Sequence, residues 1–280
     1  MSKFAARRQR LQRKFRQLQI DAMLVTHEPN VTYLTGFTGE ATSLFLTRQA
    51  AMLISDSRFE TQIEEECDGL EVDIRTQAKT SAQQMATVLK GCEARAVGFE
   101  ADHTTVSAHE GRQSDLGTHQ WRGVRGVVES LRAIKDRDEV AAIRRAVQVA
   151  EKTIAVVAAG LTAEQTEHQV VAELEYRIRQ FGGSGCAFPP IVGVGPRAAL
   201  PHAPPTDTRI GASHHVLIDW GARVGQYVSD LTRVFFTGKI PPKLQRIYGV
   251  VLNAQLTAIA AIRPGARVAD VDQAARRVIA

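Results

Sequence analysis

The chain has 280 residues, enough for one large domain or two ordinary ones. Apolar residues make up 44% and charged residues 23%, which is typical of a globular protein and excludes a disordered one. No apolar run approaches the roughly 18 residues of a membrane span. The net charge of +5 raises the question of nucleic-acid binding, but no basic, aromatic-rich motif of a DNA- or RNA-binding module occurs.

Three cysteines (Cys67, Cys92 and Cys186) lie far apart and show no paired spacing. That number excludes a disulfide framework, and no C-x-x-C motif indicates zinc or redox chemistry. The N-terminus also lacks the apolar stretch and cleavage site of a signal peptide. We therefore expect reduced thiols and a cytoplasmic protein, with neither nucleic acid nor membrane as a partner.

Much of the positive charge lies in the first sixteen residues, where apolar residues recur at helical spacing (Phe4, Leu11, Phe15 and Leu18). This pattern predicts a helix with its apolar side on the core and its basic side in water. A nucleic-acid-binding arm is the alternative. The basic residues concerned are Lys3, Arg7, Arg8, Arg10, Arg13, Lys14 and Arg16.

The first 130 residues alternate between short apolar runs and amphipathic stretches, which predicts an α/β domain with a largely buried sheet. The predicted strands are Ala22–Thr26, Ser43–Thr47, Ala51–Ser55, Val72–Arg75 and Ala96–Glu100. The predicted helices are Phe59–Glu66, Ser81–Lys90 and approximately Thr105–Leu116.

A different pattern begins near Glu129. A long helix is expected over Asp136–Ala159, followed by a second helix that Thr162 caps and that runs to Arg179. The stretch Phe181–Gly195 is rich in Gly and Pro and predicts loop or irregular strand. The remaining elements are two strands, His215–Trp220 and Gln226–Phe236, and two helices, approximately Pro242–Ile262 and Val271–Ala280.

Two aspartates interrupt the apolar runs of the two late strands. Residues of a hairpin face each other when their midpoint lies in the turn, and the midpoint of Asp219 and Asp230 falls between Val224 and Gly225. This register would place their Cβ atoms about 4.5–5.5 Å apart on one face. Opposed carboxylates repel, and a pair of divalent cations would relieve the repulsion. The alternative is that both aspartates cap turns.

His202 lies in a proline-rich segment that cannot be a helix or a central strand, so a loop leading to the strand pair is expected. A loop histidine can be catalytic or merely exposed. Four further ionisable residues crowd one predicted helix, and a solvated helix face explains them best: Glu164, Glu167, His168 and Glu173.

These residues resemble a known family, the pita-bread metallopeptidases that include Xaa-Pro aminopeptidases (aminopeptidase P) and Xaa-Pro dipeptidases (prolidases). The resemblance covers essentially the whole chain. Two N-terminal segments, Pro29–Gly39 and Asp56–Phe59, are similar to the creatinase-type domain of the family. The similarity to the catalytic domain lies in Leu131–Lys135, Asp138–Val140, Phe188–Val192, Leu200–His202, Leu217–Ala222, Ser229–Arg233 and Ala261–Gly265.

The resemblance implies a creatinase-like N-terminal domain over residues 1–130 and an α+β pita-bread metallopeptidase domain over residues 131–280. It implies that Asp219 chelates one metal ion and that Asp230 bridges two, with manganese the usual metal. It also implies that His202 binds substrate and steadies the tetrahedral intermediate. The expected substrates are small peptides with proline at the second position, and the expected assembly is a homodimer.

One departure from the family pattern concerns the metal ligands. The family uses three more, one histidine and two glutamates, and the segment Ile240–Ala280 contains neither residue type. The sequence therefore predicts an incomplete catalytic domain and a truncated chain of doubtful activity. Two alternatives stay open: an inactive or non-catalytic pita-bread binding protein, and a creatinase-like hydrolase that works without metal.

Overall fold

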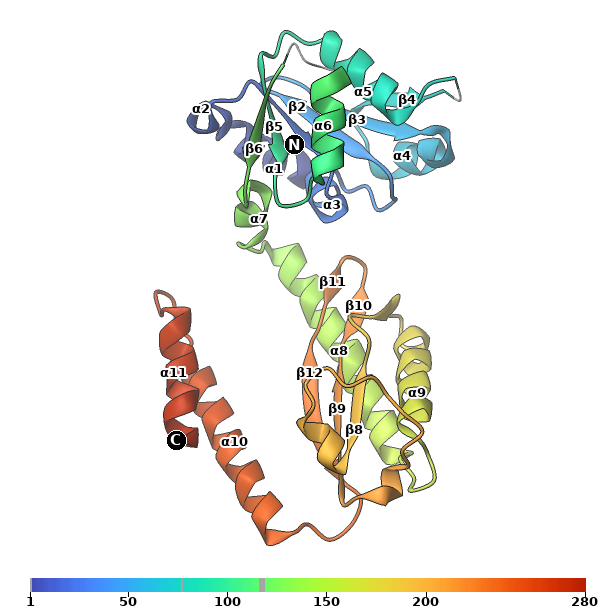
Figure 1. The fold of residues 1–280 in the computed structure, drawn as a ribbon, viewed down its shortest axis with the longest axis vertical. Helices are drawn as coiled ribbons and strands as arrows, with labels where there is room; N and C mark the ends of the chain where they lie inside the picture. The colour runs from blue at the N-terminus through green and yellow to red at the C-terminus, as the bar shows by residue number, and fades with distance from the viewer. Residues whose placement is uncertain (1, 77, 116–118) are drawn as a thin grey trace. The chain divides into compact units, whose positions relative to one another are not determined.

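The computed structural model describes residues 2–76, 78–115 and 119–280. The chain divides into two compact units, Met1–Asp136 and Arg137–Ala280 (Figure 1). The domain boundary expected at residue 130 stays a prediction. Within the described ranges, no helix is both long and apolar enough to cross a membrane.

The first unit contains a six-stranded mixed sheet in the order β4-β3-β2-β1-β5-β6. Neighbours β1–β2 and β2–β3 are antiparallel, and the other three pairs are parallel. The predicted strands are confirmed to within a residue or so at each end, whereas β6 was not predicted. The strands are β1 (Ala22–Val25), β2 (Ser43–Thr47), β3 (Ala51–Asp56), β4 (Glu71–Arg75), β5 (Ala96–Glu100) and β6 (Gln120–Val124).

Alternate residues of each strand point to opposite sides of this sheet, and apolar clusters cover both of its faces. Met23 and Leu44 pack with Leu11, Phe15 and Leu34 on one face; Leu24 and Phe45 pack with Leu89 on the other. The helices are α1 (Lys3–Gln12), α2 (Phe15–Leu18), α3 (Glu28–Thr35), α4 (Glu60–Glu66), α5 (Ser81–Lys90), α6 (Val106–Asp115) and α7 (Val127–Arg132). Leu116, the predicted end of α6, lies outside the described residues.

The basic side of α1 does not lie wholly in water, so the sequence prediction is wrong for Arg7 and Arg8, which are buried. Arg7 Nη1 donates to the carbonyl of Tyr33 at 3.0 Å, and Arg8 Nη1 donates to that of Leu34 at 2.9 Å. These carbonyls belong to the last turn of α3, where they lack intrahelical partners. The two guanidinium groups therefore cap α3 and complement the negative end of its dipole.

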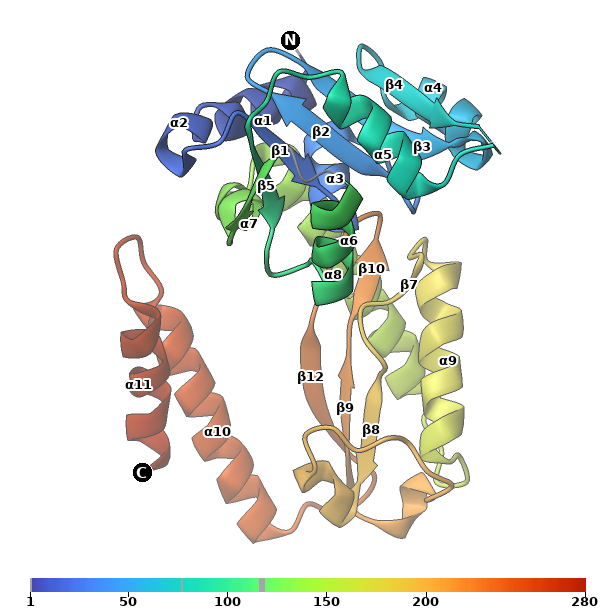
Figure 2. The same ribbon diagram turned by 45° about the horizontal axis from the view of Figure 1, so that its top comes forward.

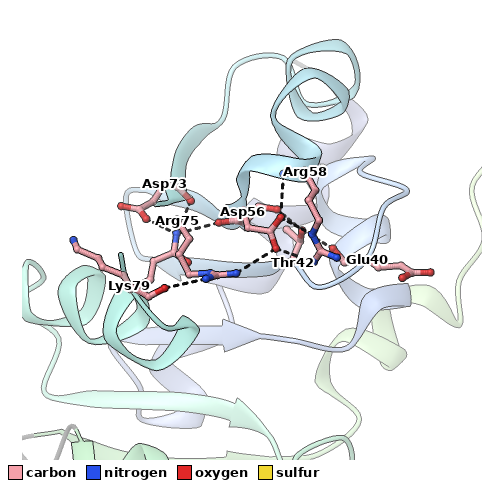
Figure 3. A network of polar contacts seen from close by, with 9 residues as sticks. Glu40, Thr42, Asp56, Arg58, Asp73, Arg75 and Lys79 are labelled. Carbon is pink, nitrogen blue, oxygen red and sulfur yellow. Dashed lines mark hydrogen bonds and ion pairs between the residues drawn. The ribbon is translucent and has the colours of Figure 1, made fainter. Parts of the chain in front are cut away.

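A polar network closes the end of β3 (Figure 3). Asp56 Oδ1 accepts from the backbone N–H of Arg58 at 3.1 Å and from its Nε at 2.9 Å, while Oδ2 accepts from its Nη2 at 2.9 Å. Arg75 Nη2 of β4 lies 3.6 Å from Oδ2. The side-chain hydrogen bond from Arg58 is the main reason that the pKa of the nearly buried Asp56 carboxyl falls to about 2.

We expect Asp56→Asn to lower the urea midpoint of unfolding at pH 7, because the amide cannot pair with two guanidinium groups. The folded pKa of about 2 lies below the unfolded value of about 3.9, so the carboxylate stabilises the fold above the unfolded pKa. This contribution is lost as the pH falls toward 2. The difference between variant and wild type should therefore shrink from about pH 4 downward.

Asp102→Asn is the matched control, because Asp102 is 47% exposed and faces Arg125 across 3.5 Å at the surface. It should change the midpoint little at any pH. A midpoint difference for Asp56→Asn that stays constant down to pH 2 would contradict the assignment.

The second unit contains two three-stranded antiparallel sheets, β12-β9-β8 and β11-β10-β7. Helices α8 and α9 pack on one side of the first of these sheets (Figure 2). The predicted strand Gln226–Phe236 consists of two strands, β11 and β12. The strands are β7 (Gly185–Cys186), β8 (Ile191–Val194), β9 (His215–Trp220), β10 (Ala222–Val224), β11 (Tyr227–Val228) and β12 (Leu231–Phe236). The helices are α8 (Arg137–Ala159), α9 (Glu167–Gln180), α10 (Pro242–Ala261) and α11 (Val268–Ile279).

The start of α9 differs from the prediction. Two successive T-x-x-Q sequences begin at Thr162 and Thr166, and each has the pattern of a capping box. Only Thr166 caps the helix: its Oγ1 accepts from the N–H of Gln169 at 3.3 Å, and Gln169 Oε1 accepts from the N–H of Thr166 at 2.9 Å. Glu167 thereby becomes the first residue of α9.

Candidate functional site

The two aspartates do not face each other across the strand pair. Asp219 of β9 faces Thr232 of β12, and the two-residue turn consists of Gly225 and Gln226. The predicted register, with the turn at Val224 and Gly225, is therefore wrong. Gly225 occupies the first central position of the turn at φ +57°, which glycine adopts without strain and a β-branched valine does not.

The shift keeps both carboxylates on one face, since pairing partners have moved by two residues and side chains alternate with period two. Asp230 lies two residues before Thr232, so it is a diagonal neighbour of Asp219 rather than its direct partner. Diagonal neighbours are about 7–8 Å apart, compared with the 4.5–5.5 Å expected for opposed residues.

Helix α8 fixes the strands that carry these aspartates. Three side chains of the strand region donate to it: Trp220 Nε1 to Ala150 O at 3.1 Å, Ser229 Oγ to Ala146 O at 3.1 Å, and Tyr227 Oη to Glu139 Oε1 at 2.7 Å. The acceptor residues Glu139, Ala146 and Ala150 are spaced seven and then four residues apart, so they lie on one side of the helix.

Trp220 directly follows Asp219, and Ser229 directly precedes Asp230, so each candidate ligand has a neighbour bonded to α8. Between them, Gly221 passes so close to Ser229 that a Cβ would lie 2.0 Å from the Ser229 carbonyl oxygen. Because strand neighbours point to opposite faces, anchoring Trp220 and Ser229 on α8 turns both carboxylates away from the helix.

The Asp219 carboxylate is only partly satisfied. Its Oδ1 is buried and has no hydrogen-bond partner among the described residues. Burial raises the pKa of Asp219, and the charge of Asp230 raises it further, while a hydrogen bond from the Thr232 side chain and the proximity of His202 act in the opposite direction. A buried polar atom without a partner is uncommon and calls for a ligand or an ion.

His202 lies on an exposed turn after η2 (Gly195–Ala199), as expected from the prolines around it. It lies close enough to Asp219 for its charge to oppose the rise in the pKa of that carboxyl. Of the three residues selected from the sequence, Asp219 and Asp230 share one face, and both Asp230 and His202 act electrostatically on Asp219. Arg233, exposed on β12, donates to the carbonyl of Thr232.

The acidic cluster on α9 is only partly a solvated helix face. Glu164 is exposed and pairs with Arg209, but Glu167 is completely buried, so the prediction is wrong for Glu167. Burial opposes ionisation of Glu167, yet hydrogen bonds from Val194, Thr206 and Arg197 together hold its pKa below the ordinary value. A buried glutamate beside a helix cap gives no signal in the sequence that separates it from its exposed neighbours.

The carboxylates of Asp219 and Asp230 suit a divalent cation as two of its ligands. Oxygen ligands of this kind bind Mn²⁺ and Mg²⁺, and the unpartnered Oδ1 of Asp219 offers a free acceptor. Over residues 2–76, 78–115 and 119–280, no three His, Cys, Asp or Glu side chains lie together in a metal-binding arrangement. The two aspartates therefore fit part of a metal centre.

Comparison with known proteins identifies the family of the chain. Residues 141–280 match "Metallopeptidase family M24", and residues 7–134 match "Creatinase/Prolidase N-terminal domain". An uncharacterized peptidase of Bacillus subtilis, YqhT, is 31% identical over 272 residues, which cover 97% of this chain and 76% of YqhT. The chain belongs to metallopeptidase family M24. Membership of this family implies divalent metal ions.

Two solved peptidase structures have the same fold. An Xaa-Pro dipeptidase from Bacillus anthracis superposes with a TM-score of 0.93 at 29% identity, over 99% of this chain and 77% of that one. An X-Pro aminopeptidase from Thermotoga maritima MSB8 gives a TM-score of 0.87 at 27% identity, over 95% and 77% of the two chains. The expected fold, a creatinase-type domain followed by a pita-bread domain, is thus confirmed.

We expect Asp219→Asn to stabilise the metal-free chain, because the amide removes a poorly compensated buried charge. The folded pKa of Asp219 is raised, so its ionised form destabilises the fold at neutral pH, and this cost disappears once the pH falls below the unfolded value of about 3.9. Differential scanning calorimetry with EDTA should show a midpoint higher by roughly 2 °C at pH 7.

Asp207→Asn, an exposed aspartate of the same unit, is the control and should leave the midpoint unchanged. A lower midpoint for Asp219→Asn at pH 7 would show that the carboxylate is compensated by contacts other than those described.

Proposed function

We propose that this protein is a metal-dependent peptidase that hydrolyses the Xaa-Pro bond at the N-terminus of peptides. The observation that carries the proposal is the shared face of Asp219 and Asp230, with an unpartnered carboxylate oxygen and a histidine beside it. The Xaa-Pro dipeptidase and X-Pro aminopeptidase folds described above support the substrate class.

In this proposal Asp219 and Asp230 would be ligands of divalent cations, most simply Mn²⁺. Such ions, when bound, polarise a carbonyl and lower the pKa of a water molecule. His202 binds the substrate: an imidazole N–H donates to the oxygen of the carbonyl that precedes proline, where negative charge develops. Its exposed position on a turn leaves the ring accessible to a peptide.

A cytoplasmic location belongs to the same proposal and is supported by the cysteines. All three are free thiols, as is usual for proteins of a reducing compartment. The proposed assembly is a homodimer, which sedimentation equilibrium would distinguish from a monomer.

A non-catalytic binding protein is the second candidate. It is favoured by one observation: the described residues bring together two carboxylates but no third metal-binding side chain. Two carboxylates alone form a weak site, since transition metals gain affinity from imidazole and from several charged ligands together.

To separate the two, the 280-residue chain is titrated with Mn²⁺ and assayed on an Xaa-Pro dipeptide and tripeptide. Alone, we expect a dissociation constant on the order of millimolar or weaker and no measurable turnover. Joined to the segment of an Xaa-Pro dipeptidase that supplies one histidine and two glutamates, the chain should cleave in the presence of Mn²⁺. Asp230→Asn should then abolish turnover, because the metal site would lose one of its charged ligands.

Asp207→Asn serves again as the control and should leave turnover intact. Retained activity in Asp230→Asn would overturn the ligand assignment, and absence of turnover in the extended chain would favour the binding protein. Relative rates on the dipeptide and the tripeptide distinguish a dipeptidase from an aminopeptidase.

The two-domain division is also a proposal. Residues 1–130 contain a complete sheet covered on both faces, so they should survive limited proteolysis as one piece. Mass spectrometry of the resistant fragments checks this, and rapid degradation of the N-terminal piece would contradict it.

A further inference from the structure

Glu167 is a completely buried carboxylate whose oxygens meet only hydrogen-bond donors. It accepts five hydrogen bonds: from Val194 N at 2.9 Å, from Arg197 Nε at 3.1 Å to each oxygen, from Thr206 N at 2.8 Å, and from Thr206 Oγ1 at 2.7 Å. A buried charge persists only when it is paired and hydrogen-bonded, and Glu167 meets both conditions.

These donors come from both sides of His202 in the chain. Val194 and Arg197 precede it, and Thr206 follows it. Arg197 also donates through Nη2 to the carbonyl of Pro204 at 2.6 Å, which links the two sides directly. One carboxylate and one guanidinium therefore close the segment 195–205, which we call the His202 loop.

The same carboxylate fixes the His202 loop relative to Asp219. Val194 ends β8, which pairs with β9 so that Val194 faces Val216 and Ile191 faces Asp219. Glu167 is itself held as the first residue of α9, where its N–H donates to the carbonyl of Thr208 at 3.1 Å. The loop therefore begins and ends on elements whose positions are set by the core.

We propose that Glu167 is a positioning residue, which holds both arms of the His202 loop and so keeps His202 beside Asp219. This inference rests on the proposed role of His202 in binding substrate. Glu167 touches neither residue and acts through the backbone of the loop.

An ionised carboxylate is the only side chain that suits this position. A glutamine would place an NH₂ group against donors of Val194, Arg197 or Thr206, leaving at least one buried donor without an acceptor. An aspartate is shorter by one methylene and cannot reach both arms. Glu167→Gln should therefore free one arm of the loop while the apolar core stays in place.

Hydrogen–deuterium exchange of the full chain tests this. We expect Glu167→Gln to accelerate exchange of the amides of the His202 loop and of its flanking residues Val194 and Thr206 by about tenfold, with α8 and β9 unchanged. Glu164→Gln is the matched control, since that glutamate lies three residues earlier and is 79% exposed. Equal acceleration throughout the second unit, or no change in the loop, would overturn the inference.

A spectroscopic readout separates positioning from stability. The imidazole Cε1–Hε1 signal of His202, assigned with His202→Gln, should move toward the random-coil position in Glu167→Gln. The signals of His214 and His215, in the same unit, should stay where they are. An unchanged His202 signal would show that the loop holds the ring without Glu167.

If Glu167→Gln fails to fold, Thr206→Val provides a milder test, because it removes the hydroxyl that donates to Glu167 at 2.7 Å and accepts from the N–H of Thr208 at 3.2 Å, and leaves the other donors to Glu167 in place. It should move the His202 signal in the same direction by a smaller amount, and no movement would count against the inference. Neither readout requires turnover. A chain without peptidase activity therefore overturns the proposed function but leaves the positioning role of Glu167 to be decided by these spectra.

Discussion

The hydrogen bonds that Trp220 and Ser229 make to carbonyl oxygens of α8 determine which side of the strand pair carries charge. A strand has two faces and a period of two, so anchoring Trp220 against the helix turns Asp219 outward. A slip of one residue would expose a large indole and press a carboxylate into the apolar core. Truncating a buried aromatic residue alone costs about 3–5 kcal/mol, so the register is strongly defined.

The second unit contains two carboxylates of opposite character. Asp219 has a raised pKa and a buried oxygen without a partner among the described residues, whereas Glu167 has a lowered pKa and accepts five hydrogen bonds from four donor groups. Burial penalises both charges, and the difference lies in the hydrogen bonds that compensate it. A fully satisfied carboxylate holds structure, and a partly satisfied one retains the capacity to bind a cation.

The sequence predicted elements better than contacts. Apolar periodicity located β1, β2, β3, β5 and β9, because these runs are largely buried and local composition reflects burial, but it missed β6, which is mostly exposed or half-buried. The same periodicity wrongly predicted that Arg7 and Arg8 are exposed to water. Their acceptors are carbonyls of α3, which are distant in sequence and leave no local signal. Likewise, the pairing of Asp219 depended on whether Gly225 stood first or second in its turn, which composition does not decide.

The composition of the His202 loop explains why it needs an anchor outside itself. Four of its residues, Pro196, Pro201, Pro204 and Pro205, lack a backbone N–H, so the loop cannot be held by a ladder of backbone hydrogen bonds. In place of that ladder, the Glu167 carboxylate of α9 accepts hydrogen bonds from Val194, Arg197 and Thr206, at the two ends of the loop and within it. The acids are therefore oriented by α8 and the histidine by α9, two helices packed on the same face of one sheet. Because both helices pack on the same sheet, the hydrogen bonds to α8 and to Glu167 of α9 together define the positions of the aspartates and of His202 relative to one another.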